Sequence, residues 1–588
     1  MTTRLKSVDV VVIGVGWAGA IMATELTRAG LSVVGLESGG PRNVADFMGP
    51  SMHDELGNQE QASPFADLSK RTVTFRNSLD ETARPVRRHG AMPWVDNVGG
   101  GGVYWAANCY RLTPWDFKVR TNTIERYGAK ALPEDCTSQD WPMSYEDMEP
   151  YYDKFERMIG AAGKAGNLNG TIVAGGNPFE GPRAHEYPNP AAPYSYEQSM
   201  FVKATEELGY HPFPIPRATM TRAYTNPDGL MLNACTYCGH CGSYACEMNA
   251  KASPQLTLLP TALASGRFEL RPRSVVTRIN LDSTGKQARS VTYVDPAGQE
   301  IEQPADIVIL SAFTFANVRL LLVSQIGVPY DPQTGKGVIG RNFTWHNHIT
   351  PAATLFFDQG HVFNYFMGSG GYGARIFDFQ GDNFDHTGLG FIGGAAIGVV
   401  NEGRGILDGA PVPPGTPAFG SAWKKAVAHY ASRSVEMTGQ HDNQAHRGNF
   451  LDLDPTYRDG FGIPMLRVTY DNKENEKKAD IYLHTKMAEI ARAMGASSVE
   501  PRGLPEHMDF AYRGSIHQSG GAICGSSPEN SAVNGYLQCW QTPNLFVVGA
   551  TALPQLPSLN PTLPVGALAY RAAEAIAQRY VKSPQLLV

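Results

Sequence analysis

The chain has 588 residues, which is more than one hydrophobic core usually supports, so we expect two or more domains that share an interface. Hydrophobic residues make up 42% and charged residues 18%, an ordinary globular balance that excludes extensive disorder. The net charge of -6 offers no basic surface to nucleic acid, and no apolar run approaches the ~20 residues of a membrane-spanning helix.

The chain begins with the elements of a βαβ unit. The β-branched run Asp9–Ile13 is typical of a strand that is buried on both faces. Only the short polar stretch 1–7 precedes it, so we expect the chain to carry no export signal of its own. A glycine-rich turn follows, then helical periodicity over Ala20–Arg28 and a second strand, Ser32–Leu36, which ends at Glu37.

The turn between strand and helix has the spacing of a dinucleotide-binding site. Gly14 allows the tight turn, Gly16 lets the backbone approach a pyrophosphate, and Gly19 brings the helix against the strand. An acid about 20 residues further on binds a ribose hydroxyl in such units, and Glu37 is placed for that role. The turn alone leaves FAD and NAD open. The residues that we expect to contact the cofactor here are Gly14, Gly16, Trp17, Ala18, Gly19 and Glu37.

Four of the eight cysteines crowd into the segment 235–246. The spacing Cys-x2-Cys-x2-Cys-x4-Cys gathers soft thiolates and favours iron–sulfur or zinc. Zinc sites more often pair two separated knuckles, and the short spacings strain a disulfide, so zinc and disulfides are the second and third alternatives. The expected metal ligands are Cys235, Cys238, Cys241 and Cys246.

Three further stretches carry a family resemblance. They are 98–105 (VGGGGVYW), 141–152 (WPMSYEDMEPYY) and the C-terminal block 515–577. Together with the first turn, and in the same order, they resemble the glucose–methanol–choline (GMC) oxidoreductases over essentially the whole chain. The resemblance implies FAD as the cofactor. It also implies further FAD contacts at Gly99, Gly100, Gly101, Gly102, Val276, Gly549, Ala550, Asn560, Pro561 and Thr562.

The resemblance also implies a catalytic pair. Oxidation of an alcohol requires an acceptor for the hydroxyl proton, and a group that titrates near neutrality favours histidine. His517 matches the family's catalytic position, and Asn560 matches the second position, where an amide can hydrogen-bond the substrate oxygen. Leu563–Ala577 is expected to be a helix whose N-terminus approaches the flavin. We expect the other histidines, among them His346 and His441, to be structural.

More narrowly, the stretches 224–227 (YTNP), 251–254 (KASP) and 449–459 (NFLDLDPTYRD) resemble the branch that contains the flavoprotein subunits of bacterial gluconate 2-dehydrogenases. That branch implies a [3Fe–4S] cluster in the cysteine loop, with Cys238, Cys241 and Cys246 as ligands. The family's loops begin with two adjacent cysteines, whereas Cys235 and Cys238 are separated here. Cys235 is therefore the expected spare, and a four-iron cluster is also open.

A cluster would carry single electrons away from the flavin, which favours a dehydrogenase over an oxidase. The resemblance implies oxidation of a secondary hydroxyl of a sugar acid or sugar, with gluconate to 2-ketogluconate preferred and a cytochrome c or quinone as the final acceptor. The alternatives are a glucoside 3-dehydrogenase, another sugar dehydrogenase (glucose, fructose or ketogluconate), or a non-catalytic flavoprotein with structural zinc.

The implied partners are a small subunit that carries the export signal and a multihaem cytochrome c that anchors the complex. They would place the chain on the periplasmic side of the inner membrane; without a partner it would be cytoplasmic. The expected fold is α/β, with a discontinuous Rossmann-like FAD-binding domain and a substrate-binding domain built on an antiparallel sheet. The expected boundaries are 1–200, 271–339 and 509–588 for the FAD-binding domain, 201–270 for the iron–sulfur segment and 340–508 for the substrate-binding domain.

Overall fold

The largest sheet is built around the long strand β16 (Glu300–Leu310). Its second half pairs in parallel with β2 (Val8–Ile13) and β26 (Leu545–Val547), and its first half pairs with β15 (Ala288–Val294) and β1 (Thr3–Arg4). The computed structural model that shows this arrangement describes residues 2–42, 46, 67–68, 71–87, 95–238, 241, 245–346, 351–364, 373–400, 411–510 and 516–587.

The N-terminal βαβ unit forms as predicted. Strand β2 leads into α1 (Trp17–Arg28), which returns to β3 (Val33–Leu36), and β2 pairs in parallel with β3. Val10, Val11 and Val12 of β2 are fully buried because helices or loops cover both faces of a parallel sheet. The helix begins at Trp17, before the expected Ala20, because Gly16 is its N-cap. The main path of the sheet is β13 (Phe268–Arg271), β3, β2, β16, β15 and β14 (Val275–Leu281).

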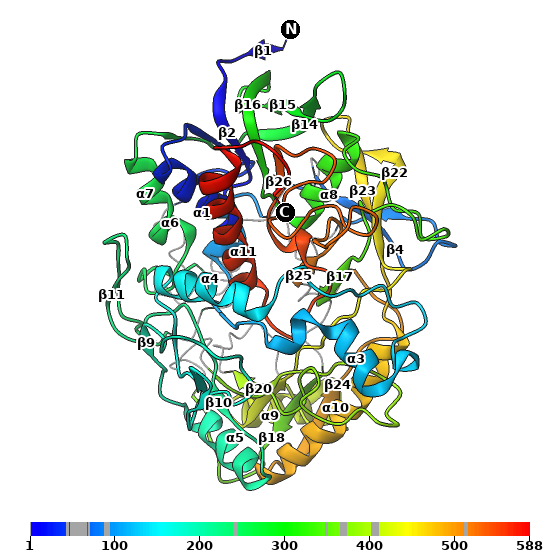
Figure 1. Cartoon of the computed structure of the whole chain (residues 1–588). Helices are drawn as coiled ribbons and strands as arrows, with labels where there is room; N and C mark the ends of the chain where they lie inside the picture. Colours follow the sequence, from blue (N-terminus) through cyan, green and yellow to red (C-terminus); the bar gives the residue numbers. More distant parts are fainter. Residues whose placement is uncertain are drawn as a thin grey trace.

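The C-terminus returns to this sheet, so the Rossmann-like unit is discontinuous in sequence. Helix α11 (Thr562–Ala575) packs between α1 and α4 (Tyr145–Met158), as Figure 1 shows. Helix α4 begins at a capping box in which the Ser144 amide donates to Asp147 and the Asp147 amide donates to the Ser144 hydroxyl.

A second, antiparallel sheet forms the other half of the molecule, below the first in Figure 1. Helices α5 (Tyr196–Glu207) and α10 (Glu474–Ala493) pack against it and share a separate hydrophobic core with it. The expected antiparallel sheet is thus confirmed. In spatial order its strands are β10 (Phe213–Pro214), β19 (Gly373–Ile376), β20 (Ile397–Val400), β21 (Ser434–Thr438), β18 (Ala352–Phe356) and β24 (Ser498–Arg502).

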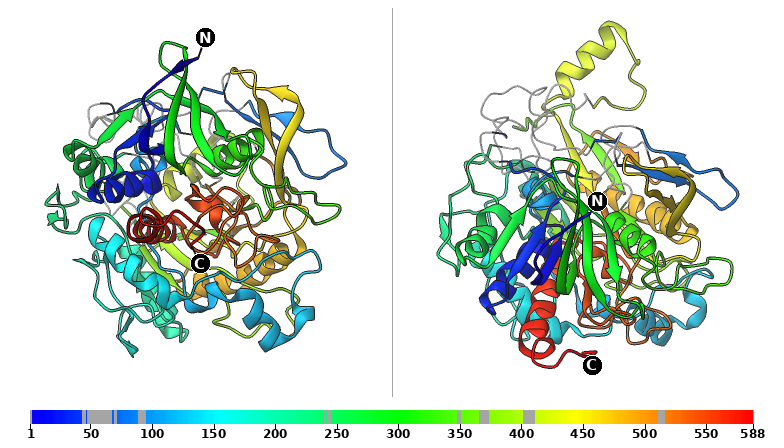
Figure 2. Two further views of the ribbon diagram at one scale, coloured as in Figure 1. Left: turned by 45° about the horizontal axis from the view of Figure 1, so that its top comes forward. Right: turned by 90° about the horizontal axis from the view of Figure 1, so that it is seen from above.

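A short strand pair, β17 (Thr344–His346) with β25 (Ile516–Ser519), lies between the two halves in Figure 1. The views of Figure 2 show that α9 (Gly420–Tyr430) projects from the body of the molecule.

The predicted domain boundaries stay predictions. A four-stranded sheet contains β22 (Phe450–Arg458), β23 (Pro464–Thr469), β4 (Val73–Arg76) and β5 (Arg84–Pro85). Further helices are α3 (Val119–Tyr127), α6 (Pro254–Thr257), α7 (Leu259–Ala264) and α8 (Thr314–Val323). The remaining short strands are β6 (Ala162–Gly163), β7 (Asn167–Leu168), β8 (Thr171–Ile172), β9 (Asn189–Pro190), β11 (Tyr224–Thr225) and β12 (Met231–Leu232).

Candidate active site

The first glycine turn joins β2 to α1 and is closed by Glu37. Gly14 has a φ of +87°, and a Cβ there would lie 2.6 Å from the Cα of Ala312, so only glycine fits. The Glu37 carboxylate is 6% exposed and accepts the amides of Val15 and Gly39, each at 2.8 Å. Each of its oxygens receives one amide and can still accept a ribose hydroxyl. Burial raises the pKa of Glu37.

The second glycine loop lies against the first, and the two loops approach each other through backbone atoms. The amide of Gly99 donates to the carbonyl of Val15 at 3.0 Å, which ties the two loops together. Among the described residues, a Cβ on Gly16 would meet only the Gly99 oxygen, at 3.9 Å, and a Cβ on Gly100 would lie 3.4 Å from the Gly16 Cα. Gly16, the N-cap of helix α1, supplies no side-chain hydrogen bond. The first backbone amides of the helix therefore face the strip of backbone between the two glycine loops. The arrangement fits a pyrophosphate, which binds at uncapped helix N-termini.

The C-terminal segments complete the arrangement. Beyond β26, a Cβ on Gly549 would have no neighbour within 4 Å in the part of the chain that the structure describes. Asn560 is 7% exposed, and among the described residues its side-chain oxygen has no hydrogen-bond partner. Helix α11 begins at Thr562, with Pro561 as an N-cap that supplies no side-chain hydrogen bond.

Val276 lies on β14, two residues after Ser274. The turn that precedes it is hydrogen-bonded to the dinucleotide unit, because the Ser274 amide donates to the carbonyl of Glu37 at 2.8 Å. This hydrogen bond brings the segment that contains Val276, a predicted FAD contact, next to Glu37, the predicted ribose ligand. The two facing glycine loops and two uncapped helix N-termini supply backbone donors, and the buried acid supplies an acceptor; this set of groups fits FAD.

His517 and Asn560 lie side by side where the two halves of the molecule meet. His517 belongs to β25 and has a φ of +65°, a left-handed conformation that a non-glycine residue rarely adopts. Its Nε2 lies 3.2 Å from the side-chain amide nitrogen of Asn560. Because an amide nitrogen can only donate, the Nε2 that faces it is the acceptor.

Sequence reasoning missed a third member of this group. His346, which we expected to be structural, places its Nδ1 2.9 Å from the Nδ1 of His517. The other nitrogen of its ring lies 2.8 Å from the carbonyl oxygen of His441. No sequence signal could have shown this contact, because the two histidines are separated by 171 positions.

The two histidine rings are held neutral. Burial lowers the pKa of His517 to about 3 and, together with the neighbouring His517, lowers the pKa of His346 well below its ordinary value. We expected the proton acceptor to titrate near neutrality. The structure differs because the ring that contacts His517 belongs to another buried histidine and not to a carboxylate. At neutral pH, His517 is therefore already in the form that accepts a proton.

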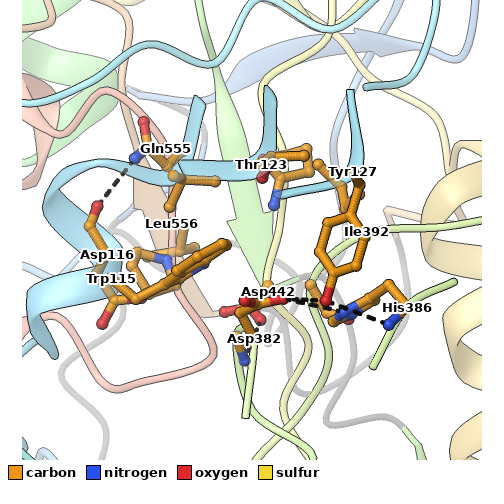
Figure 3. Close-up of a pocket in the computed structure, with 15 residues that line it drawn as sticks. Trp115, Asp116, Thr123, Tyr127, Asp382, His386, Ile392, Asp442, Gln555 and Leu556 are labelled. Carbon is orange, nitrogen blue, oxygen red and sulfur yellow. Dashed lines mark hydrogen bonds and ion pairs between the residues drawn. The ribbon is translucent and has the colours of Figure 1, made fainter. Parts of the chain in front are cut away.

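The turn that leads to Asn560 is supported by a second residue that the sequence analysis missed. Asp442 accepts the Ser558 amide at 2.7 Å through one carboxylate oxygen, and the amides of Gly381 and Gly394 through the other, at 3.0 and 2.7 Å. Asp442 lines a pocket whose wall includes residues 555–557. Figure 3 shows Asp382 and Asp442 between Trp115 on one side and Tyr127 with His386 on the other.

The cysteine loop gathers thiols beside two cations. Burial raises the pKa of Cys241 to about 12; Arg217 and Lys251 oppose that rise, and Cys235 and Cys238 add to it. The Sγ atoms of Cys235 and Cys246 each accept a backbone amide at 3.3 Å. Among the residues that the structure describes, which omit 239–240 and 242–244, no three His, Cys, Asp or Glu side chains are arranged to hold a metal ion.

The same loop is held against the second glycine loop. The Lys251 ammonium donates to the carbonyls of Trp105 and Cys241, at 2.7 and 2.8 Å. Ala245, from the cysteine loop, packs against Val103, from the glycine loop. The cysteines therefore lie next to a segment that is expected to contact the flavin.

Comparison with known proteins identifies the class to which this fold and site belong. The family described as GMC oxidoreductase matches residues 445–569. Over its whole length the chain is also 42% identical to the gluconate 2-dehydrogenase flavoprotein of Pantoea cypripedii, 96% of which is covered. The chain belongs to the GMC oxidoreductase family and is an FAD-dependent oxidoreductase that acts on CH–OH groups.

More distant relatives cover the whole chain as well. Fructose dehydrogenase large subunit of Gluconobacter japonicus is 25% identical, with 98% of this chain and 99% of that protein covered. Pyridoxine 4-oxidase from Mesorbium loti has a similar structure, with a TM-score of 0.58, 16% identity and coverage of 97% and 99%. This likeness confirms the expected fold. No helix that the structure describes is both long enough and apolar enough to cross a membrane.

Proposed function

We propose that the chain oxidises a secondary hydroxyl of a sugar acid or sugar, with gluconate to 2-ketogluconate as the preferred reaction. The main support for this reaction is the contact between the unprotonated Nε2 of His517 and the side-chain amide nitrogen of Asn560, which lie 3.2 Å apart. The 42% identity to a gluconate 2-dehydrogenase flavoprotein supports the choice of substrate.

In the proposed reaction His517 is the general base. Its Nε2 accepts the proton of the substrate hydroxyl while the C–H bond of the same carbon breaks, and the ketone forms. FAD, when bound, accepts the hydride and with it both electrons. Asn560 donates its amide hydrogen to the substrate oxygen, which gains negative charge as its proton leaves. After proton transfer, that amide and the His517 imidazolium both stabilise the ketone oxygen.

The residues that would hold FAD are those of the two glycine loops and the two helix starts. Glu37 would accept ribose hydroxyls, and the strip between Gly16 and Gly100 would hold the pyrophosphate. The uncapped start of α11, after Pro561, would face the isoalloxazine ring and favour its anionic reduced form.

We propose that electrons leave through the cysteine loop and that the chain is a dehydrogenase. Support comes from the density of cysteines in 235–246 and from the contacts of Lys251 and Ala245 with the second glycine loop. Two amide-to-sulfur hydrogen bonds, to Cys235 and Cys246, are of the kind that stabilise thiolates. No step of the reaction above depends on a cluster, since the described cysteines are not arranged as ligands.

Iron analysis tests this electron exit. We expect iron and acid-labile sulfide in the purified protein and an EPR signal in its oxidised form. Cys241→Ser should abolish the signal, because Cys241 is one of the three expected cluster ligands. Cys235→Ser, the expected spare, is the matched control and should retain it. Zinc in place of iron would show a structural site, and absence of both metals would refute the proposal.

The partners follow from this electron exit. We propose a small subunit that supplies the export signal and a multihaem cytochrome c that receives the electrons, which places the complex on the periplasmic side of the inner membrane. The name of the Gluconobacter relative, a large subunit, supports a multi-subunit assembly. Another sugar is the alternative substrate, and the fructose dehydrogenase relative favours fructose among these.

An anaerobic flavin titration tests the reaction and the substrate together. Gluconate should bleach the flavin absorbance of the FAD-loaded protein faster than fructose, glucose, ketogluconate or a glucoside. His517→Ala should slow bleaching by ~10²- to 10⁴-fold, because the proton acceptor is lost. His386→Ala removes a buried histidine from the neighbouring pocket and is the control. An unchanged rate in His517→Ala would refute the catalytic role, and faster bleaching by another sugar would replace gluconate.

A further inference from the structure

His346 and His517 form a chain of hydrogen bonds whose direction can be read from its two ends. His346 lies at the end of β17 and is 3% exposed. One ring nitrogen, Nε2, is 2.8 Å from the carbonyl oxygen of His441. The other, Nδ1, is 2.9 Å from the Nδ1 of His517. At the far end of the chain, the Nε2 of His517 faces the Asn560 amide at 3.2 Å.

The carbonyl oxygen of His441, at one end of this chain of hydrogen bonds, determines which ring nitrogens along it carry a hydrogen. A carbonyl oxygen only accepts, so the Nε2 of His346 carries the hydrogen. Burial keeps the pKa of His346 far below neutrality, so the ring holds no second proton and its Nδ1 is an acceptor. The Nδ1 of His517 must then carry the hydrogen between the two rings. The lone pair of His517 is left on Nε2, on the side of Asn560.

We propose that His346 is a positioning residue for the oxidation, which accepts the Nδ1 hydrogen of His517 and thereby presents the unprotonated Nε2 to the substrate hydroxyl. The inference rests on the proposed function, in which His517 is the base. Without His346, the His517 ring could place its hydrogen on Nε2 instead, and the proton acceptor would then point away from the substrate.

A second consequence follows from the chemical nature of the partner. A carboxylate in the place of His346 would stabilise the imidazolium form and raise the pKa of His517. A neutral histidine fixes the same tautomer without adding a charge. Among the described residues, the carbonyl of Pro557 and the side chain of His441 also act on the His346 ring, and His441 is hydrogen-bonded to Asp480 at 2.9 Å. They stay in place in the variants below.

Three substitutions at one position separate positioning from packing. His346→Asn keeps an acceptor oxygen near the position of the imidazole Nδ1, whereas His346→Leu fills similar space without an acceptor. We expect His346→Leu to lower the limiting rate of flavin reduction by ~10²-fold or more, with little change in KM, because the tautomer is no longer fixed. His346→Asn should recover most of that loss. His386→Leu, in the neighbouring pocket, controls for the removal of a buried imidazole.

The pH profile gives a readout that a packing role would not change. His346→Asp should move the acid limb of the flavin-reduction rate to higher pH, because a carboxylate at Nδ1 raises the pKa of His517. His346→Asn should leave that limb in place. Equal losses in the asparagine and leucine variants with an unchanged pH profile would overturn the proposal, and so would a leucine variant as fast as the wild type.

A measurement without substrate separates this proposal from the proposed function. In FAD-loaded protein with ¹⁵N-labelled histidine, the resonances assigned to His517 by their loss in His517→Ala should show Nδ1 protonated and Nε2 bare. In His346→Leu we expect that pattern to be lost. A failure of gluconate to reduce the wild-type flavin would count against the proposed function alone. A wild-type His517 protonated on Nε2 would overturn the positioning role, whatever the substrate.

Discussion

Gly14 and Gly16 belong to the same turn, yet a side chain would harm the protein through different physical effects at the two positions. At Gly14 a Cβ would lie 2.6 Å from the backbone of Ala312, and φ is +87°. At Gly16 the nearest described atom to a Cβ would be 3.9 Å away. A side chain at Gly14 would therefore clash with the protein itself, whereas a side chain at Gly16 would enter the proposed pyrophosphate site.

Two substitutions test this difference. Gly16→Val should give a protein that lacks FAD but unfolds at the same temperature as deflavinated wild type, because the side chain fills only the strip between the glycine loops. Gly14→Ala should lower the free energy of unfolding by ~1–3 kcal/mol even without FAD, because the backbone is strained. Flavin absorbance and thermal unfolding of both apoproteins measure the two effects. Full FAD content in Gly16→Val would show that the cofactor does not lie there.

At the scale of elements, an ionic triad around the buried His446 joins helix α10 to two loops. The His446 ring is 1% exposed; its Nδ1 is 2.8 Å from Asp135, and its Nε2 is 3.2 Å from Glu476 on α10. The two carboxylates raise the pKa of His446 to about 9, against the opposite effect of burial. His446, which we expected to be structural, thus holds a charge that links segments distant in sequence.

The stability from this triad should depend on pH. Because the folded pKa is raised, the contribution is complete below the unfolded value near 6.5 and is lost as pH rises through about 9. We expect His446→Gln to be less stable than wild type by ~3 kcal/mol at pH 6, and the gap to narrow at pH 9.5. Urea unfolding of both proteins at both pH values measures the gap. An equal gap at the two pH values would contradict the charged state of His446.

At the scale of the whole molecule, the described residues form two large hydrophobic cores, and a short strand pair lies between the two halves. One core surrounds the eight-stranded sheet, and the other lies between the six-stranded sheet and helices α5 and α10. Strand β25 pairs with β17, and its neighbour Gly520 donates its amide to the Ala550 carbonyl at 2.9 Å, beside the predicted FAD contacts. The proposed base therefore lies at the strand pair between the two halves, and their relative orientation would set its distance from a bound flavin.

Helices and strands were predictable where the residues that determine them lie close together in the sequence. The βαβ unit of β2, α1 and β3 could be predicted because strand, turn, helix and Glu37 lie within about 30 residues. Helix α11 was expected at 563–577 and is found at Thr562–Ala575. The neighbourhood of His517 and Asn560 was implied by family resemblance, and the structure places the pair 3.2 Å apart.

Contacts between distant segments were not predictable. His346 resembled any buried histidine in the sequence, because nothing near it in the chain indicates the ring that it meets. The low pKa of His517 depends on its burial in the folded chain, which residue spacing does not encode. Asp442 likewise acts on the Ser558 turn from a remote loop.

The amino-acid sequence by itself determined the dinucleotide turn, the family and therefore FAD, because these depend on short runs of residues whose backbone geometry is set locally. Only the tertiary structure decided which nitrogen of His517 is left unprotonated. A tautomer depends on the partner of the opposite ring nitrogen, and that partner comes from the neighbouring strand β17, 171 positions away in the sequence. The glycine turn could be recognised from the sequence alone, whereas the tautomer of His517 required the folded chain.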